Sequence, residues 1–105
     1  MAPVMRISPE QREAIREVVR EVFGPGARVR LFGSRVRDEA RGGDIDLHVE
    51  LPQAPPPGER LALESRAWLA LQRRLGERRI DLVTHAPGEP ERPIDEIARA
   101  TGIEL

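Results

Sequence analysis

The sequence predicts an α/β fold in which a short mixed sheet carries helices packed mainly on one face. Apolar residues recur with a helical period over about 9–23 and about 59–75. They alternate with the period of a strand over about 28–32, 44–51 and 79–84. Helical and extended segments therefore follow one another along the chain, which is the order expected of a layered α/β domain.

The first helix is predicted from Pro9 to Phe23. Ser8 and Gln11 form the pattern of a capping box, with proline at the first helical position, and Gly24 ends the helix. Its apolar face consists of Ala14, Ile15, Val18, Val19, Val22 and Phe23.

The remaining elements are predicted from alternation, helical period and breakers. In order they are a strand Arg28–Phe32, a strand from Asp44 to about Leu51, a proline-rich connector 52–58, a helix from about Glu59 to Leu75, a strand Arg79–Thr84 and a helix Ile94–Ala100. The apolar stripe of the longer helix, expected to face the sheet, comprises Leu61, Leu63, Ala67, Trp68, Leu71 and Leu75.

Three aspartates lie on predicted strands in a pattern suited to divalent metal ions. Asp44 and Asp46 point to the same side of their strand, while Ile45 points to the other side, into the core. Mg²⁺ prefers hard oxygen ligands, and a pair of ions 3.5–4 Å apart is the usual two-metal arrangement, as a rough guide. Asp81, in the third strand, is the expected ligand or base on the attacking side. We therefore expect all three acids to be catalytic metal ligands for two Mg²⁺ ions, with Mn²⁺ as an alternative.

A Gly-Ser turn precedes these acids and is suited to phosphate groups. Gly33 follows the first strand and allows a sharp turn and close approach of a ligand, and Ser34 adds a hydroxyl. Arg35 and Arg37 follow, and a guanidinium matches phosphate oxygens well. We expect these four residues to bind a nucleoside triphosphate, which together with two metals makes a nucleotidyl-transfer site.

Each of these residues also has a plainer interpretation. Asp44, Asp46 and Asp81 could be exposed strand residues, and the two arginines an exposed turn. His48 is expected at the rim of the site or at an interface, and His85 in a loop. Ile103 and Leu105, near the end of the sequence, could either close the core or dock a partner. Trp68 could do either as well.

Composition narrows the class of protein. With 105 residues the chain is expected to form a single domain, 1–105, too small for a separate acceptor-binding module, so a partner or a second copy of the chain is expected. Cysteine is absent and no long apolar run occurs, which predicts a cytoplasmic protein without membrane contact. A net charge of −1 and 3% aromatic residues argue against nucleic-acid binding.

The run LFGSRVRDEARGGDIDLHVE, residues 31–50, resembles the signature of the DNA polymerase β-like nucleotidyltransferase superfamily, most of all its minimal (MNT-type) members. The stretch from Ser34 to Asp44 is one residue shorter than the common pattern, and Gly43 stands where serine is frequent. These differences leave the three acids in place and leave nucleotide preference open. The resemblance implies the polymerase β-like fold and a metal-dependent nucleotidyltransferase.

Many minimal members are antitoxins paired with a HEPN-domain toxin. The resemblance thus implies transfer of AMP from ATP onto a hydroxyl, such as a tyrosine, of a HEPN-type partner. A rival hypothesis is a non-catalytic, nucleotide-binding antitoxin or subunit that acts by covering its partner. The three intact acids favour the enzyme, because a pure binder does not need them. An enzyme that modifies a small molecule is disfavoured, because such relatives carry extra acceptor-binding elements.

Overall fold

The computed structural model describes residues 7–33 and 45–105. Within these ranges the elements are α1 (Pro9–Phe23), β1 (Arg28–Phe32), β2 (Ile45–Glu50), α2 (Arg60–Leu75), β3 (Ile80–His85), α3 (Pro93–Thr101) and β4 (Ile103–Glu104). The strands form one sheet of order β3-β2-β1-β4, in which β1 is antiparallel to β2 and β4 and β2 is parallel to β3. The predicted α/β fold with a mixed sheet is confirmed.

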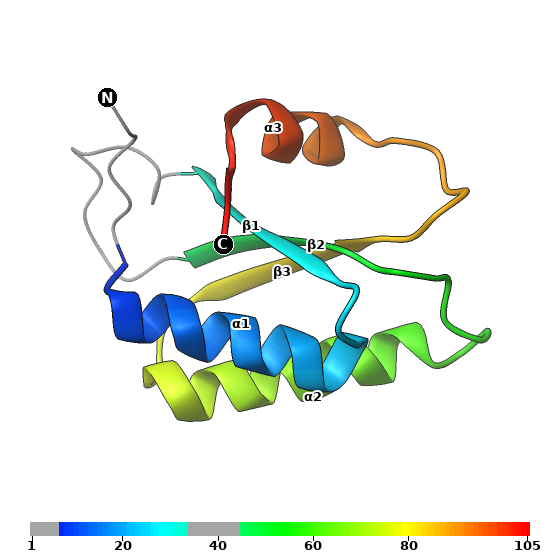
Figure 1. Ribbon diagram of the computed structural model, residues 1–105. Helices are drawn as coiled ribbons and strands as arrows, with labels where there is room; N and C mark the ends of the chain where they lie inside the picture. Colours follow the sequence, from blue (N-terminus) through cyan, green and yellow to red (C-terminus); the bar gives the residue numbers. More distant parts are fainter. Residues whose placement is uncertain (1–6, 34–44) are drawn as a thin grey trace.

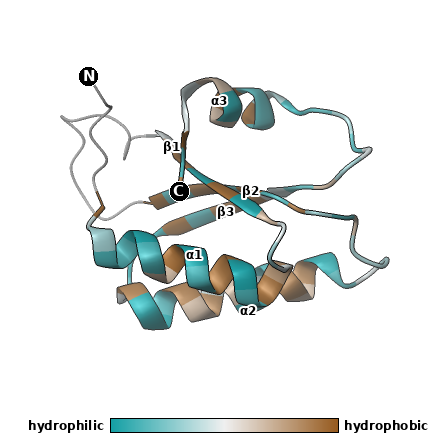
Figure 2. Cartoon of the chain, viewed as in Figure 1, coloured by the Kyte–Doolittle hydropathy of each residue, from teal (hydrophilic) through white to brown (hydrophobic). Residues whose placement is uncertain are grey.

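The helices form two unequal layers around the sheet (Figure 1). α1 and α2 lie side by side against one face, whereas α3 lies over the other face. Both helices carry hydrophobic residues along their length (Figure 2), of which Ile15 and Val18 on α1 and Leu71 on α2 are buried. The main core lies between this helical layer and the sheet, and its fully buried members include Ile15, Leu31, Ile45, Leu47, Val49 and Leu71.

The two faces of β2 differ in chemistry. Ile45, Leu47 and Val49 are fully buried in the core. The alternate residues Asp46, His48 and Glu50 therefore project to the face that carries α3. We call this the acidic face. A sheet with helices mainly on one face would leave this face uncovered, but α3 covers part of it. Packing of α3 against the sheet is a tertiary event that the local pattern does not specify.

β3 forms one edge of the sheet, and side chains of the same chain occupy part of that edge. The carbonyl of Arg79 accepts a hydrogen bond from the amide of Ile45, and that of His85 accepts one from the amide of Leu51. The backbone groups of the even-numbered residues between them therefore point away from β2, toward the outside of the sheet. The outward carbonyl of Ile80 accepts a 3.0 Å bond from Trp68 Nε1. That of Thr84 accepts bonds from Arg60 and Arg92 at 2.7 and 2.6 Å.

α2 has a more exposed outer side than its stripe predicts. Leu71 is fully buried, but Leu61, Leu69 and Trp68 are 73%, 51% and 40% exposed. Trp68 nonetheless lies against the structure through its bond to Ile80. The prediction that Leu61 belongs to the buried stripe is therefore wrong, because the first turn of α2 extends past the edge of the core.

The end of the sequence forms a strand that the pattern does not predict. Ile103 and Glu104 pair with β1, and the amide of Leu105 donates to the carbonyl of Val29 at 2.9 Å. Leu105 is buried in the core. Of the two interpretations for this segment, the structure therefore supports core closure.

The predicted boundaries of α1 and β1 are confirmed. Those of α2, β3 and α3 shift by one residue, and β2 ends at Glu50.

Candidate functional site

The ends of three strands meet at one edge of the acidic face. Gly33 directly follows β1, and Asp46 and Asp81 are the second residues of β2 and β3. Phe32 pairs with Asp46 across the antiparallel ladder, and Asp46 pairs with Asp81 across the parallel one. Since paired strands lie about 4.8 Å apart and partners in register share a face, the two aspartates are neighbours on the acidic face.

Gly33 is shaped to accept the carboxylate of Asp46. Its φ is +73°, in the left-handed region that favours glycine. A Cβ atom at this position would lie 2.3 Å from Oδ2 of Asp46 and 3.0 Å from its Cγ. The Asp46 carboxylate therefore lies against the backbone of Gly33, and a side chain at residue 33 would displace it.

Asp81 is open to solvent. Its side chain is 53% exposed, and Nε of Arg79 lies 3.7 Å from its Oδ2. A carboxylate in this position is accessible to an incoming cation. The structure thus places the two described acids of the predicted triad together, one beside the Gly33 backbone and one facing outward.

The remaining predicted site residues, Ser34, Arg35, Arg37 and Asp44, lie outside the described residues. Within ranges 7–33 and 45–105, no cluster of three or more acidic or histidine side chains suited to a metal occurs. Asp46 and Asp81 supply two hard oxygen donors on adjacent strands, and Asp44 is two residues before Asp46 in the sequence. This donor set fits Mg²⁺, which is held by one or two carboxylates together with substrate phosphates.

A buried hydrogen bond between two side chains fixes α3 next to this site. His48, two residues beyond Asp46, is fully buried, and its Nε2 lies 2.8 Å from Oδ1 of Asp95 on α3. Asp95 is also buried and accepts further bonds from the backbone and guanidinium of Arg92. The hydrogen bonds from Arg92, more than offsetting burial, hold the pKa of Asp95 well below its usual range.

The prediction of His48 at a rim or an interface is therefore wrong. Alternation correctly assigns it to the face of Asp46, but its partner is 47 residues away in the sequence. The prediction of His85 in a loop is also wrong. It ends β3, is 7% exposed, and bonds Glu50 of β2. The proline at the first position of α3 and the acid two residues later signal the helix start, but not what it covers.

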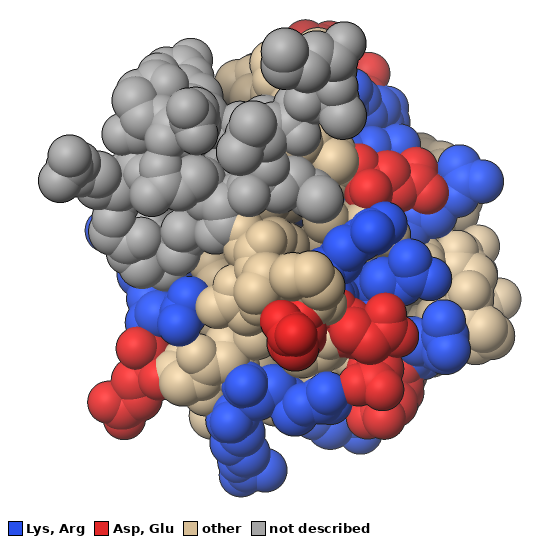
Figure 3. Space-filling view, turned by 60° about the vertical axis from the view of Figure 1, so that its left-hand side comes forward, with Lys and Arg blue, Asp and Glu red and all other residues tan. Residues whose placement is uncertain are grey.

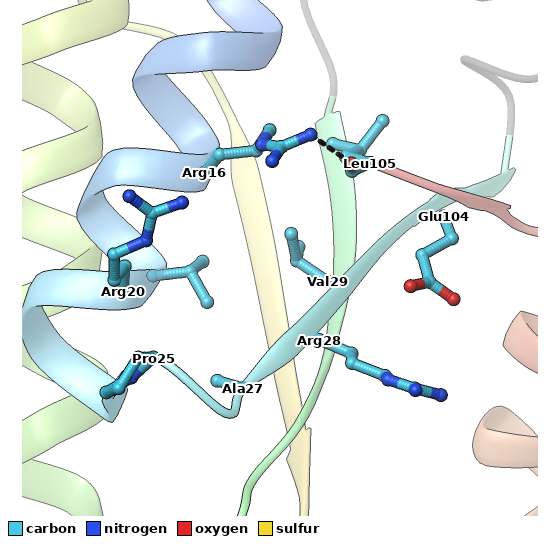
Figure 4. Close-up of a pocket in the computed structure, with 9 residues that line it drawn as sticks. Arg16, Arg20, Pro25, Ala27, Arg28, Val29, Glu104 and Leu105 are labelled. Carbon is cyan, nitrogen blue, oxygen red and sulfur yellow. Dashed lines mark hydrogen bonds between the residues drawn. The ribbon is translucent and has the colours of Figure 1, made fainter.

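A hollow of about 160 Å³ between α1 and β1 also carries charge (Figure 4). Arg16, Arg20 and Arg28 line it together with Glu104. Arg16 donates to the carbonyl of Leu105 at 3.0 Å, and Arg28 points away from the other two (Figure 4). Because the guanidinium groups do not converge, this hollow is a weaker candidate than the strand-end site.

The visible surface in Figure 3 mixes acidic and basic side chains over short distances. In the described part of the chain, no helix has the length and apolar character needed to cross a membrane.

Comparison with known families identifies the domain. No curated protein matches the chain closely enough to count as a relative. The model of the nucleotidyltransferase domain family matches residues 12–101, a range that includes Gly33 and all three predicted acids. The sheet and helices are consistent with the polymerase β-like nucleotidyltransferase fold. Such domains generally act on nucleoside triphosphates with divalent metal ions, and this chain belongs to the nucleotidyltransferase domain family.

Proposed function

We propose that this chain transfers AMP from ATP onto a hydroxyl group of a partner protein, with two Mg²⁺ ions held by Asp44, Asp46 and Asp81. Membership of the nucleotidyltransferase domain family supports the general reaction. The observation that carries the assignment of residues is the register of Asp46 with Asp81, beside a glycine whose missing side chain leaves room for the Asp46 carboxylate.

In the proposed reaction the acceptor oxygen forms a bond to the α-phosphorus of ATP. The bond between that phosphorus and the α,β-bridging oxygen breaks, and pyrophosphate leaves. The acceptor hydroxyl loses its proton to a base, and the exposed Asp81 carboxylate is suited to this role. Asp46 and the Gly33 turn orient the triphosphate, with Ser34, Arg35 and Arg37 as its further proposed contacts. Divalent ions, when bound, activate the attacking oxygen and stabilise the leaving one.

We further propose that the acceptor belongs to a HEPN-type toxin, so that the chain is its antitoxin. The support is the MNT-type motif over residues 31–50. A second copy of this chain is the other partner to consider.

The test is transfer of label from α-³²P-ATP to a HEPN-type protein that is incubated with this chain in the presence of Mg²⁺ or Mn²⁺. Asp46→Asn and Asp81→Asn should each lower transfer on the order of 100-fold or more. Glu96→Gln is the matched control, because Glu96 is an exposed acid on α3 outside the site. It should transfer label at the wild-type rate.

Titration of Mn²⁺, followed by electron paramagnetic resonance, separates binding from chemistry. Asp46→Asn should weaken Mn²⁺ binding in the presence of nucleotide. Asp81→Asn should retain ATP binding and lose turnover, since its proposed role is on the attacking side. If the wild type silences the HEPN-type protein without labelling it, and both variants silence it equally well, the non-catalytic binder is the correct function.

A further inference from the structure

The second buried histidine has an unusual pair of partners. His85, the last residue of β3, has its Nδ1 3.0 Å from Oε2 of Glu50 and its Nε2 3.2 Å from the carbonyl oxygen of Glu89. Glu50 is at the end of the neighbouring strand, and Glu89 lies in the segment that joins β3 to α3. The ring thus connects the sheet to residues 86–92.

Both partners act as acceptors. A backbone carbonyl oxygen has no proton to donate. Glu50 also accepts hydrogen bonds from the guanidinium of Arg99 through its other oxygen, as expected of an ionised carboxylate. Two acceptors require two ring N–H groups, and only the protonated imidazolium has both. A neutral ring can keep one of these bonds but not both.

We propose that His85 is a pH-sensitive tie that, as an imidazolium, holds the turn at Glu89 to the sheet and loosens this turn when the ring loses a proton. This device is separate from nucleotidyl transfer, since neither His85 nor its partners belong to the proposed site. His85 is four residues beyond Asp81, at the opposite end of β3.

The surroundings of the ring are predominantly acidic, which supports the charged form. The hydrogen bond from His85 to Glu50, more than offsetting burial, raises the pKa of the ring above its ordinary value. Burial alone would raise the pKa of Glu50, but the bonds from Arg99 and His85 lower it. The charged groups around the ring, from each element packed near it, are Glu50 on β2, Asp95 and Arg99 on α3, Glu89, Glu91 and Arg92 in the joining segment, and Arg60 and Glu64 on α2.

The turn around Glu89 lies directly before the base of α3. The joining segment leads directly into this helix, whose Asp95 is bonded to His48 on the acidic face. Glu89 also accepts from Arg60, and Ala86 donates to Glu89 at 2.9 Å, so the turn is tied to α2 as well. Loss of the His85 tie therefore loosens the turn at its sheet side while α3 stays held by Asp95. Each unit by which the ring pKa is raised corresponds to about a tenfold preference for the tied state.

The experiment is NMR on the wild-type chain, whose two histidines give two sets of ring signals. His85→Gln identifies the His85 set. The titration runs from roughly pH 5.5 to 9, a range that brackets an ordinary histidine. We expect the midpoint of His85 to lie above the ordinary value of about 6.5, with both ring N–H groups present below that midpoint. Amide exchange in residues 86–92, corrected for its intrinsic pH dependence, should accelerate with the same midpoint.

Two variants test whether Glu50 is the group that raises the His85 midpoint. Glu50→Gln removes the carboxylate and should lower the His85 midpoint to the ordinary range or below, whereas Glu96→Gln, an exposed acid on α3, should leave it within the error of the wild type. A wild-type His85 that titrates at or below about 6.5 would overturn the proposal. So would exchange in residues 86–92 that does not follow the His85 midpoint.

Discussion

At the scale of single residues, position 33 has two requirements that only glycine meets together. Gly33 adopts a φ of +73°, and the carboxylate of Asp46 occupies the space where a Cβ would lie. The first requirement is conformational and the second is steric. They can be separated by experiment, because Gly58 has a φ of +86° but open space where its Cβ would lie.

Gly33→Ala and Gly58→Ala should therefore differ in function more than in stability. Each variant should lose about 1–2 kcal/mol of stability from the left-handed backbone. Only Gly33→Ala should push Asp46 from its position, and a displacement of about 1 Å can lower transfer about 100-fold. Urea unfolding and label transfer, measured on both variants, provide the comparison. Equal transfer by the two would show that the contact with Asp46 is unimportant.

Asp95 is the residue whose loss should cost the fold most on the α3 side. It is buried and accepts hydrogen bonds from His48 and Arg92. Asp95→Ala leaves both donors without their partner, which should lower the free energy of unfolding by about 2–4 kcal/mol. Glu96→Ala, one residue along and exposed, should change it by less than about 0.5 kcal/mol. Similar unfolding midpoints for the two variants would contradict this account.

At the scale of elements, α2 shows how helical period separates buried from exposed positions. Leu71 and Leu69 are two residues apart, yet Leu71 is fully buried and Leu69 is 51% exposed. Leu71→Ala should cost about 2–5 kcal/mol through the cavity that it leaves between α2 and the sheet. Leu69→Ala should cost much less. Thermal or urea unfolding of the pair tests whether α2 packs in this rotation, and the reverse order of stabilities would require a different one.

The elements also show which features can be predicted from the sequence. α1 is predicted correctly because its signals are local: Ser8 and Gln11 cap each other, and Gly24 ends the helix. The two-residue strand β4 is not predicted, because its pairing with Arg30 and Leu31 depends on how α3 returns the chain to the sheet.

Some features of the candidate site can likewise be predicted from the sequence, and others cannot. Alternation places Asp46 and His48 on one face, as the structure shows. The register of Asp46 with Asp81 and the contact with Gly33 depend on long-range pairing, which the spacing of residues does not fix. Burial of His48 and His85 could not be inferred either, because the groups that cover and bond them come from α3 and from the segment before it.

At the scale of the whole molecule, changes in protonation should lower the free energy of unfolding at both acid and alkaline pH. The hydrogen bonds of Arg92 with Asp95, and those of Arg60 with Glu89, lower the pKa values of these acids in the folded state. Their contribution is therefore present above the ordinary carboxyl pKa of about 4 and is lost as the pH falls further. His85 has a raised pKa, so its contribution is complete below about 6.5 and is lost as the pH rises through the folded-state value.

The free energy of unfolding should thus be highest between roughly pH 5 and 6.5. Urea unfolding at intervals from pH 3 to 9, a rough range chosen to include both limits, measures the curve. His85→Gln should flatten the alkaline side, and it should change the acid side only through the part of the Glu50 shift that His85 causes. A wild-type curve that stays level from acid to alkaline pH would contradict the assignment of these groups.

The edge of the sheet at β3 has a consequence for the behaviour of many molecules together. An exposed strand can add a strand from another chain when a run of its outward backbone groups is free. Here the outward carbonyls of Ile80 and Thr84 already accept bonds from Trp68, Arg60 and Arg92. These occupied carbonyls interrupt the run of outward backbone groups, which makes this edge a poorer template for an added strand. The same side chains that tie the helices to the sheet should therefore also lower the tendency of this edge to pair with another molecule.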